Sequence, residues 1–455
     1  MWPSRIGWNL YLAYHLRGQA LWPFQPLEVV QAAQRRRIGA IVGHAFRSVP
    51  YYQEMTGRLG LSPNDFQTAD DLARLPILER AQIQRDPEYF VSRDIPLEDC
   101  LELHSAGSSG TPVTVFHNPA SVFQNAAHAE RERSMITALV GRKAGYREMV
   151  FVPRESSAGA VQAYLQRKGF FPPGLRIQRR YVGLDETPER AVAALNAFKP
   201  HLVHGIGSSL GAVFAYLESS GRPFHRPRAI SFSSDGMSDP TRCLIEGSFG
   251  IPVLGAYQAV EAFKIGFECR YSAAMHLNLD IYPLRVMDAN CSTLPIGERG
   301  EVVVSNLVNR ASVLLNYRLG DIAARVPGAC PCGRSLPLLS LIEGRNDDWL
   351  ELRSGRRVHA QTVHPLVKSE PIWKYQVIQA AHTEFQVLVV PSGSCDHERT
   401  RARIAERFVN EFGADTRVEV RFVERIDRGH NGKFRAIISR VSASAAAATS
   451  RNGHP

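Results

Sequence analysis

Cysteine and long apolar runs are both scarce in this sequence. Seven cysteines in 455 residues are too few and too irregularly spaced for the disulfide framework of a secreted protein. We therefore expect the protein to reside in the reducing cytoplasm. No run approaches the roughly 18 consecutive apolar residues of a membrane span. The aromatic residues 1–24 are interrupted by basic side chains and lack a signal-peptide cleavage site, so we expect no targeting segment. Peripheral contact of this Trp-rich segment with a membrane surface is an alternative that the sequence allows.

The composition also lacks any bias toward disordered, collagen-like or coiled-coil chains. Hydrophobic residues make up 44%, charged residues 22% and aromatic residues 9%, which is typical of a folded soluble protein. At about 150 residues per domain, the length predicts about three compact units or two unequal ones.

Lysine is rare, although the chain is basic. Of 54 basic residues only seven are lysine, and the formal net charge is +10. The densest basic run, residues 35–37, is expected on the solvated face of a helix. No basic stripe with interleaved aromatic residues appears, so we expect no nucleic-acid partner and favour a nucleotide or phosphate ligand.

Apolar periodicity divides the chain into segments. Residues 38–49 carry apolar side chains at helical spacing up to Pro50, which predicts a docking helix. From about residue 100 to 340, short apolar runs alternate with helix-like stretches, which favours an α/β body. The runs that predict strands are 149–152, 201–204 and 229–232, and those that predict helices are 188–198 and 209–217.

The pattern changes beyond about Arg345. Strand-like stretches at 375–381, 384–390 and 417–424 flank one helical run, 398–412, so we predict a small α+β domain. The low-complexity residues after 441 are expected to be disordered. The expected segments are an N-terminal arm and docking helix (1–50), a large body (51–344), a small C-terminal domain (345–441) and a tail (442–455).

Small residues are concentrated at 104–113, His-Ser-Ala-Gly-Ser-Ser-Gly-Thr-Pro-Val, just before a strand-like stretch. A loop of this kind exposes consecutive backbone N–H groups and hydroxyls, which bind phosphate. It is not a Walker A motif, because no Gly-Lys-Ser/Thr closes it. A flexible Ser/Gly turn is the alternative.

Four motifs in one order resemble those of the adenylate-forming superfamily, and within it the phenylacetate-CoA ligase-like branch with the related capsule-biosynthesis proteins. They are the Ser/Gly loop, Tyr257 to Glu261, Tyr317 to Asp321 followed by Gly344 to Asp348, and Asn431 to Lys433. Each motif is common alone, whereas their shared order and spacing are specific. The resemblance implies a large α/β N-terminal body of several subdomains and a small α+β C-terminal lid domain.

The resemblance also implies a nucleotide site. Tyr257 would lie against adenine, Glu261 would help to bind Mg²⁺, and Asp321 would accept hydrogen bonds from the ribose hydroxyls. For Asp321, a turn residue after a glycine is the alternative. Arg345 would contact ribose or phosphate near a hinge at Asp347. The loop residues that would hold the ATP phosphates are Ser105, Gly107, Ser108, Ser109, Gly110 and Thr111.

Lys433 is the main catalyst that the resemblance implies. When a carboxylate attacks the α-phosphate of ATP, a positive charge beside the reacting oxygens stabilises the transition state. The alternative is a solvent-facing hairpin lysine. The family implies, in addition, that the lid rotates about the hinge between adenylation and thioester formation.

A second constellation is Cys269, His276, Cys330 and Cys332, in which the last two form a Cys-Pro-Cys-Gly sequence. Three thiolates and one imidazole suit a tetrahedral structural Zn²⁺, and similar cysteines recur in the phenylacetate-CoA ligase-like branch. Reduced, buried thiols without metal are the alternative. The remaining cysteines are expected to be ordinary core or surface thiols: Cys100, Cys243, Cys291 and Cys395.

Three positions depart from the family pattern. Thr111 stands where many members carry a lysine, which removes one charged contact to phosphate. Gln258 and Val260 replace a usual Gly and a usual Ser or Thr, and the loss of that hydroxyl affects turnover more than nucleotide binding.

These patterns together predict an ATP- and Mg²⁺-dependent ligase that adenylates a carboxylic acid and passes the acyl group to a thiol, coenzyme A. An acyl acceptor other than CoA, in polysaccharide or natural-product assembly, is one alternative. A catalytically silent nucleotide-binding relative is the other. An aryl or medium-sized acid is the family default, but the mixed polar and apolar residues of the expected pocket do not specify one acid, and the oligomeric state is not readable.

Overall fold

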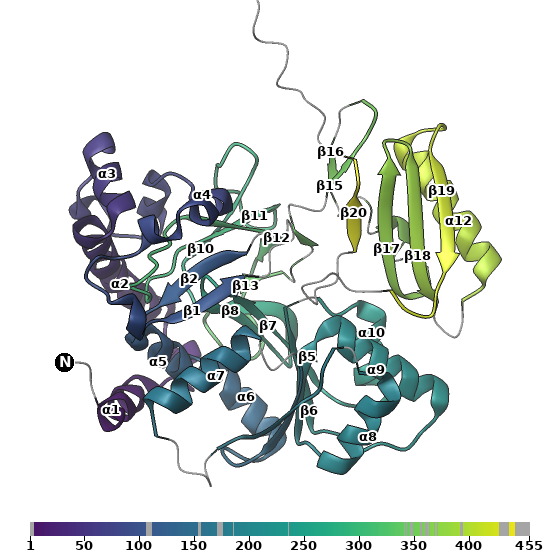
Figure 1. Ribbon diagram of the computed structural model, residues 1–455, viewed down its shortest axis with the longest axis horizontal. Helices are drawn as coiled ribbons and strands as arrows, with labels where there is room; N and C mark the ends of the chain where they lie inside the picture. The colour runs from purple at the N-terminus through teal and green to yellow at the C-terminus, as the bar shows by residue number, and fades with distance from the viewer. Residues whose placement is uncertain are drawn as a thin grey trace, which may run out of the picture. The chain divides into compact units, whose positions relative to one another are not determined.

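The structure is a computed structural model in which the chain divides by its internal contacts into unit 1, Met1–Ile342, and unit 2, Glu343–Pro455 (Figure 1). The residues that the structure describes are 4–105, 112–152, 156–170, 176–184, 186–234, 236–340, 342, 344–345, 349–354, 357–359, 363, 365–367, 369–370, 372–391, 395–426 and 436–441. Among them, no helix is both long and apolar enough to cross a lipid bilayer.

Unit 1 holds most of the helices and one large sheet. Its α-helices are α1 (Arg5–Leu16), α2 (Leu27–Ser48), α3 (Pro50–Leu59), α4 (Arg80–Arg85), α5 (Pro119–His128), α6 (Glu130–Val140), α7 (Ser157–Lys168), α8 (Pro188–Phe198), α9 (Gly207–Ser220) and α10 (Asp239–Cys243). Its strands are β1 (Leu101–Ser105), β2 (Val113–His117), β3 (Arg147–Phe151), β4 (Gln178–Tyr181), β5 (Leu202–Ile206), β6 (Ala229–Ser233), β7 (Val253–Ala259), β8 (Phe263–Cys269), β9 (Ser272–Leu277), β10 (Leu284–Met287), β11 (Arg299–Val304), β12 (Tyr317–Val326) and β13 (Leu338–Leu339).

Local sequence signals explain where several helices begin and end. Helix α8 begins after Thr187, whose hydroxyl accepts a hydrogen bond from the backbone N–H of Arg190, and Pro188 occupies the first helical position. Ser156 caps α7 in the same way. Pro50 both ends the apolar pattern of α2 and begins α3, because a proline at the first turn needs no N–H partner.

The large sheet has a parallel and an antiparallel part. In strand order β10-β11-β12-β13-β9-β8-β7-β6-β5-β3-β4, the strands from β7 to β4 pair in parallel, and those from β10 to β7 pair antiparallel. Strands β3 and β5 to β7 are joined through helices, as parallel strands require. Strands β1 and β2 form a separate antiparallel pair.

Helix α2 belongs to the main hydrophobic core of unit 1. Ile38, Ile41 and Val42 are buried with side chains of β11 such as Val302 and Val304. The basic run on this helix is only partly solvated. Arg35 and Arg36 are exposed, as expected, but Arg37 lies 3.1 Å from the buried carboxylate of Asp280.

Asp280 is the centre of a buried ion cluster. Its two carboxylate oxygens accept hydrogen bonds from Arg131 at 2.6 and 2.9 Å, and Arg131 is itself buried. Gln19 and Asn278 accept further hydrogen bonds from this guanidinium, so each charged group has partners. The cluster joins α2 and α6 to the segment between β9 and β10.

Buried asparagines connect distant parts of unit 1. The Asn309 side chain donates to the carbonyl oxygen of Phe116 at 2.8 Å and accepts from the backbone N–H of Asn118 at 3.3 Å. The Asn306 amide donates to the carbonyl oxygen of Glu261 at 2.9 Å. These side chains hydrogen-bond backbone groups of segments that lie far apart in the sequence.

Unit 2 is a small α+β domain. Its strands are β14 (Gly344–Arg345), β15 (Trp349–Glu351), β16 (Arg357–His359), β17 (Ile372–Ala381), β18 (Glu384–Pro391), β19 (Arg417–Phe422) and β20 (Ile437–Ser439), and helix α12 (His397–Phe412) follows β18 in the sequence. The sheet order is β19-β18-β17-β20, with β15 and β16 paired separately. Phe408 and Ile404 of α12 pack with Val387 of β18 in one core.

The observed fold confirms the predicted fold class, a large α/β body followed by a small α+β C-terminal domain. Expected and observed helices agree closely, since the stretch 188–198 is α8 and 398–412 is all but the first residue of α12. The division after Ile342 lies close to the expected end of the body at 344. Residues 442–455 lie outside the described residues.

Candidate nucleotide site and metal centre

Tyr257 and Asp321 lie side by side in unit 1. The phenol of Tyr257, near the end of β7, donates a hydrogen bond to Asp321 Oδ2 at 2.7 Å. They come from positions 64 residues apart on strands that are not neighbours in the sheet. The structure therefore joins two of the motifs that the sequence analysis assigned to one site.

Both residues sit where strand pairing is irregular. The register of β7 against β8 shifts between Tyr257 and Gln258, and the register of β11 against β12 shifts in the stretch opposite Leu319 to Asp321. Gly320 has a φ of 77°, in the left-handed region that favours glycine. Such bulges re-aim side chains next to functional sites. Asp321 thus lies within the irregular part of a strand, and the alternative of an ordinary turn residue is wrong.

Glu261 is buried, with 5% of its surface exposed. Its carboxylate Oε1 accepts a hydrogen bond from the hydroxyl of Tyr317 at 3.2 Å, and its backbone oxygen accepts from the Asn306 amide. Tyr317 begins β12 and shares the main core with Tyr257. A buried carboxylate with a fixed phenol donor is an oriented oxygen ligand, the type that Mg²⁺ prefers.

Ser105, the last residue of β1, is held from two sides. Its Oγ accepts a hydrogen bond from Arg80 Nη2 at 2.8 Å and another from the backbone N–H of Val113 at 3.2 Å. Arg80 is the first residue of α4, and its Nε is buried with no hydrogen-bond partner among the described residues. A guanidinium therefore lies where the chain enters the Ser/Gly loop.

Arg80 is a residue that the sequence analysis missed. It lies 25 positions before Ser105 and belongs to none of the four motifs, so no spacing pattern connects it to the loop. Only the packing of α4 against β2 and β12 brings it there.

The two unusual residues near Glu261 lie in different surroundings. Gln258 is exposed at the end of β7. Val260 is half-buried and packs against the main core, and its carbonyl oxygen contacts His117 Nε2 at 2.9 Å. Burial lowers the pKa of His117 to about 4, so this imidazole is neutral at pH 7.

Several predicted site residues fall outside the described residues. These are Gly107, Ser108, Ser109, Gly110, Thr111, Asp347 and Lys433. Arg345 is described only as part of the backbone of β14. Their roles stay predictions from the sequence.

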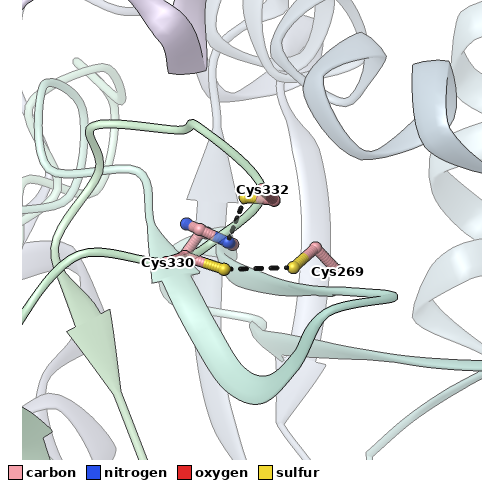
Figure 2. A group of neighbouring side chains, drawn as sticks. Cys269, Cys330 and Cys332 are labelled. Carbon is pink, nitrogen blue, oxygen red and sulfur yellow. Dashed lines mark hydrogen bonds between the residues drawn. The ribbon is translucent and has the colours of Figure 1, made fainter.

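The four residues of the second constellation meet at one point. One ligand atom from each of Cys269, His276, Cys330 and Cys332 lies within 4.8 Å of all the others. Figure 2 shows the three thiol side chains pointing toward one another, with Cys269 Sγ 3.5 Å from Cys330 Sγ. Cys332 Sγ lies 3.4 Å from His276 Nε2.

Strand pairing explains this convergence. Cys269 ends β8 and His276 lies on β9, the two strands of one hairpin. Strand β13 pairs with β9, with Leu338 opposite His276, so the loop before β13 returns to this hairpin. That loop carries Cys330 and Cys332, and the N–H of Gly333 donates to the Cys330 carbonyl in a tight turn.

The chemistry of this donor set fits a tetrahedral zinc ion. Zn²⁺ binds sulfur at about 2.3 Å and imidazole nitrogen at about 2.0 Å, which requires ligand atoms roughly 3.5–4 Å apart. Burial lowers the pKa of His276 to about 4, so the imidazole is in the neutral form that binds metal. Burial raises the pKa of the Cys330 thiol to about 12, which a bound cation would reverse.

The other cysteines lie apart from this cluster. Cys243 and Cys291 are exposed, and Cys100 and Cys395 are half-buried. Their positions agree with the expectation of core or surface thiols.

Comparison with known proteins finds similar sequences that span most of the chain. Residues 350–440 match the family described as the CapK C-terminal domain. The phenylacetate-coenzyme A ligase of Thermus thermophilus is 23% identical over 416 residues, which cover 86% of this chain and 85% of that protein. Protein CapK of Staphylococcus aureus is 20% identical over 422 residues, covering 90% of this chain and 89% of CapK.

Among solved structures, a similar fold occurs in a 2-hydroxyisobutyryl-CoA ligase crystallised in the postadenylation state with an acyl-AMP. The TM-score is 0.72 and the identity is 20%, with 91% of this chain and 90% of that chain covered. At this identity the likeness shows the fold, and the site residues rest on the sequence motifs and their geometry.

Proposed function

We propose that this chain, a member of the adenylate-forming superfamily in the branch of phenylacetate-CoA ligases and CapK, activates a carboxylic acid with ATP and transfers the acyl group to coenzyme A. The observation that carries the proposal is the direct hydrogen bond between Tyr257 and Asp321, which joins two of the family motifs. In the first step a carboxylate oxygen attacks the α-phosphorus and pyrophosphate leaves. In the second, the thiol of CoA attacks the acyl carbon and AMP leaves.

Tyr257 and Asp321 form the nucleoside part of the proposed site. The ring of Tyr257 offers an aromatic face to adenine, and its hydroxyl fixes the Asp321 carboxylate. A carboxylate is a suitable acceptor for hydrogen bonds from the two ribose hydroxyls. One phenol thus serves stacking and orientation at once.

Glu261 is the proposed ligand of Mg²⁺. When bound, the ion would neutralise phosphate charge as pyrophosphate leaves. Tyr317 holds the Glu261 carboxylate in one orientation, and Asn306 holds its backbone. Tyr317 and Asn306 are both buried, so this support does not depend on the hydroxyl that many relatives carry at the position of Val260.

Arg80 is proposed to supply positive charge near the triphosphate. It already binds Ser105, where the Ser/Gly loop begins, and one of its nitrogens has no partner among the described residues. An arginine presents several donors to phosphate oxygens. This contact would compensate for Thr111, which stands where many relatives carry a lysine.

Lys433 is the proposed catalyst of adenylation, with Arg345 on the nucleotide and a hinge at Asp347. A cation next to the attacking and leaving oxygens stabilises their negative charge in the transition state. These three assignments rest on the sequence motifs.

The cluster of Cys269, His276, Cys330 and Cys332 is proposed to bind structural Zn²⁺. Four protein ligands leave no open coordination position, so the site would stabilise the fold and not take part in catalysis. It would fix the loop before β13 to the β8–β9 hairpin.

ATP–pyrophosphate exchange over a panel of aryl, acyl and hydroxy acids tests the proposal. We expect exchange with some acids, and a fall of at least 100-fold in the Lys433→Ala variant. Lys143→Ala, at an exposed lysine, is the matched control and should exchange at the wild-type rate. ATP binding without exchange for any acid in a broad panel would favour a silent nucleotide-binding protein.

The acceptor is tested separately with the best acid. Consumption of CoA with release of AMP is expected, and mass spectrometry would detect the acyl-CoA. Exchange without thioester formation would instead favour a different acceptor, an amine, a hydroxyl or a carrier-protein thiol.

A further inference from the structure

Helix α1 presents an apolar stripe to solvent. Ile6, Leu10 and Tyr14 recur every four residues, and 71%, 67% and 73% of their surfaces are exposed. We call these three side chains the α1 stripe. Contiguous exposed apolar patches often mark interaction surfaces in monomeric proteins.

The opposite face of α1 is firmly attached to unit 1. Trp8 is buried and stacks on Phe123 of α5 with ring centroids 5.0 Å apart. Figure 1 shows α1 at the edge of the unit, next to α5. The helix is therefore held in place, and the α1 stripe is presented without an ordering step.

Two further large apolar side chains are exposed near α1. Phe170 follows α7, is 53% exposed, and has its backbone N–H bonded to the Asn9 side chain of α1 at 2.8 Å. Leu21 is 67% exposed just after α1. The apolar surface thus continues from the helix onto the end of α7.

Basic residues border this surface. Arg17 is exposed at the C-terminal end of α1, and Arg5 is exposed at its start, where it donates to the carbonyl oxygen of Gly169 at 2.7 Å. Arg167, at the end of α7, is exposed as well. No acidic residue occurs in the sequence before Glu28. We call these three arginines the basic rim.

We propose that the α1 stripe and the basic rim form a docking surface for an anionic lipid membrane. Apolar side chains enter the boundary of head groups and acyl chains while arginines bind the lipid phosphates, as in helices that lie in a membrane interface. The proposal does not depend on the enzymatic activity.

The charge pattern disfavours a second copy of the chain on this surface. In a two-fold symmetric contact the same patch meets itself, so each basic rim would face the other. Like charges at such an interface oppose association. Anionic head groups supply the opposite charge.

The test is co-sedimentation of the full chain with vesicles of phosphatidylcholine alone or with 30% phosphatidylglycerol. We expect binding to the anionic vesicles that weakens steeply with salt. Ile6→Asp/Leu10→Asp should weaken binding at least tenfold, and Arg17→Glu should weaken it severalfold. Ile296→Asp is the matched control, because Ile296 is 56% exposed elsewhere in unit 1 and should bind like wild type.

Thermal unfolding of each variant shows that it is folded, since all the changed side chains are exposed. The proposal is overturned if the anionic vesicles do not bind the wild-type chain, or if Ile296→Asp loses as much binding as Ile6→Asp/Leu10→Asp. It is equally overturned if light scattering finds a dimer that only the Ile6→Asp/Leu10→Asp variant dissociates, because a second copy then covers the stripe.

Discussion

The Cys/His cluster and the nucleotide residues differ in how their polar groups are satisfied. In the cluster, Cys269, His276, Cys330 and Cys332 each bring one ligand atom to within 4.8 Å of the others. In the proposed nucleotide site, Tyr257 and Tyr317 each use a hydroxyl to orient a carboxylate, a group that accepts hydrogen bonds from hydroxyls and binds Mg²⁺. A closed set of groups around one point can stabilise a fold by holding a metal ion, whereas an open set, two oriented carboxylates, can bind a substrate. The two regions should therefore respond differently to substitution.

The largest effect is expected on stability, from the closed set. With zinc in the proposed site, Cys330→Ser should remove the ion and lower the free energy of unfolding by roughly 4–5 kcal/mol, since loss of a structural metal belongs to the most damaging changes. Zinc content and denaturant unfolding measure this. Cys243→Ser, at an exposed cysteine outside the cluster, is the control. Unchanged zinc content and stability in Cys330→Ser would contradict the proposed zinc site.

The next effect is expected on activity, from the open set. Glu261→Gln keeps the shape but removes the charge proposed to bind Mg²⁺, so pyrophosphate exchange should fall on the order of 100-fold. Its unfolding free energy should change little, and more Mg²⁺ should be needed for half-maximal rate. Glu218→Gln, at an exposed glutamate, is the control. A large loss of stability without loss of exchange would show that Glu261 stabilises the fold and does not act in the reaction.

The buried ion cluster of Asp280, Arg131 and Arg37 is a third case. Its charged groups bind one another, and no metal ion is needed to hold them together. Burial alone would raise the pKa of Asp280, but the two arginines outweigh it and lower the pKa from 3.8 to about 2. A carboxyl whose pKa is lower in the folded than in the unfolded state stabilises the fold. This stabilisation is complete when the pH is above the unfolded-state pKa. This contribution, about 2 kcal/mol, is lost as the pH falls from about 4 to about 2.

Acid unfolding of wild type and Asp280→Asn measures this contribution. The wild-type chain should lose about 2 kcal/mol more than the variant between pH 4 and pH 2, because the variant has no carboxyl to protonate at this position. Parallel stability curves for the two proteins would show that Asp280 keeps its ordinary pKa.

The smallest effect is expected at Tyr257. Tyr257→Phe keeps the ring proposed to lie against adenine but removes the hydrogen bond to Asp321, so the KM for ATP should rise about tenfold with a smaller change in kcat. Initial-rate kinetics at several ATP concentrations would measure it. An equal fall in kcat would mean that the hydroxyl acts in the transition state and not in ground-state binding.

Much of the fold was predictable from local patterns. Helix α8 follows from its Thr-Pro start and apolar spacing, and β6 follows from a run of residues that are buried on both faces. The dual role of Pro50 was not foreseen, because a proline ends one helix and begins another equally well. The charge run at 35–37 was misjudged at Arg37, since its partner Asp280 lies 243 positions away.

The site was predictable where a motif keeps its residues close together. The Cys-Pro-Cys-Gly turn and the Tyr257 to Glu261 segment are visible in sequence, and the structure adds which groups they meet. Arg80 was not predictable, because its contact with Ser105 depends on how α4 packs and not on any local pattern. The hydrogen bond from Tyr317 to Glu261 also arises from tertiary packing across 56 positions.

The asparagine contacts determine how late in synthesis unit 1 can complete its core. Phe116 and Asn118 reach their partner Asn309 only after about 190 further residues have been made, which takes on the order of 10–40 seconds at a typical ribosomal rate. Until then the backbone groups of this segment have no Asn309 side chain to bind. Unit 1 can complete its core only when more than three hundred residues have left the ribosome, so a nascent chain halted earlier would expose that core to chaperones.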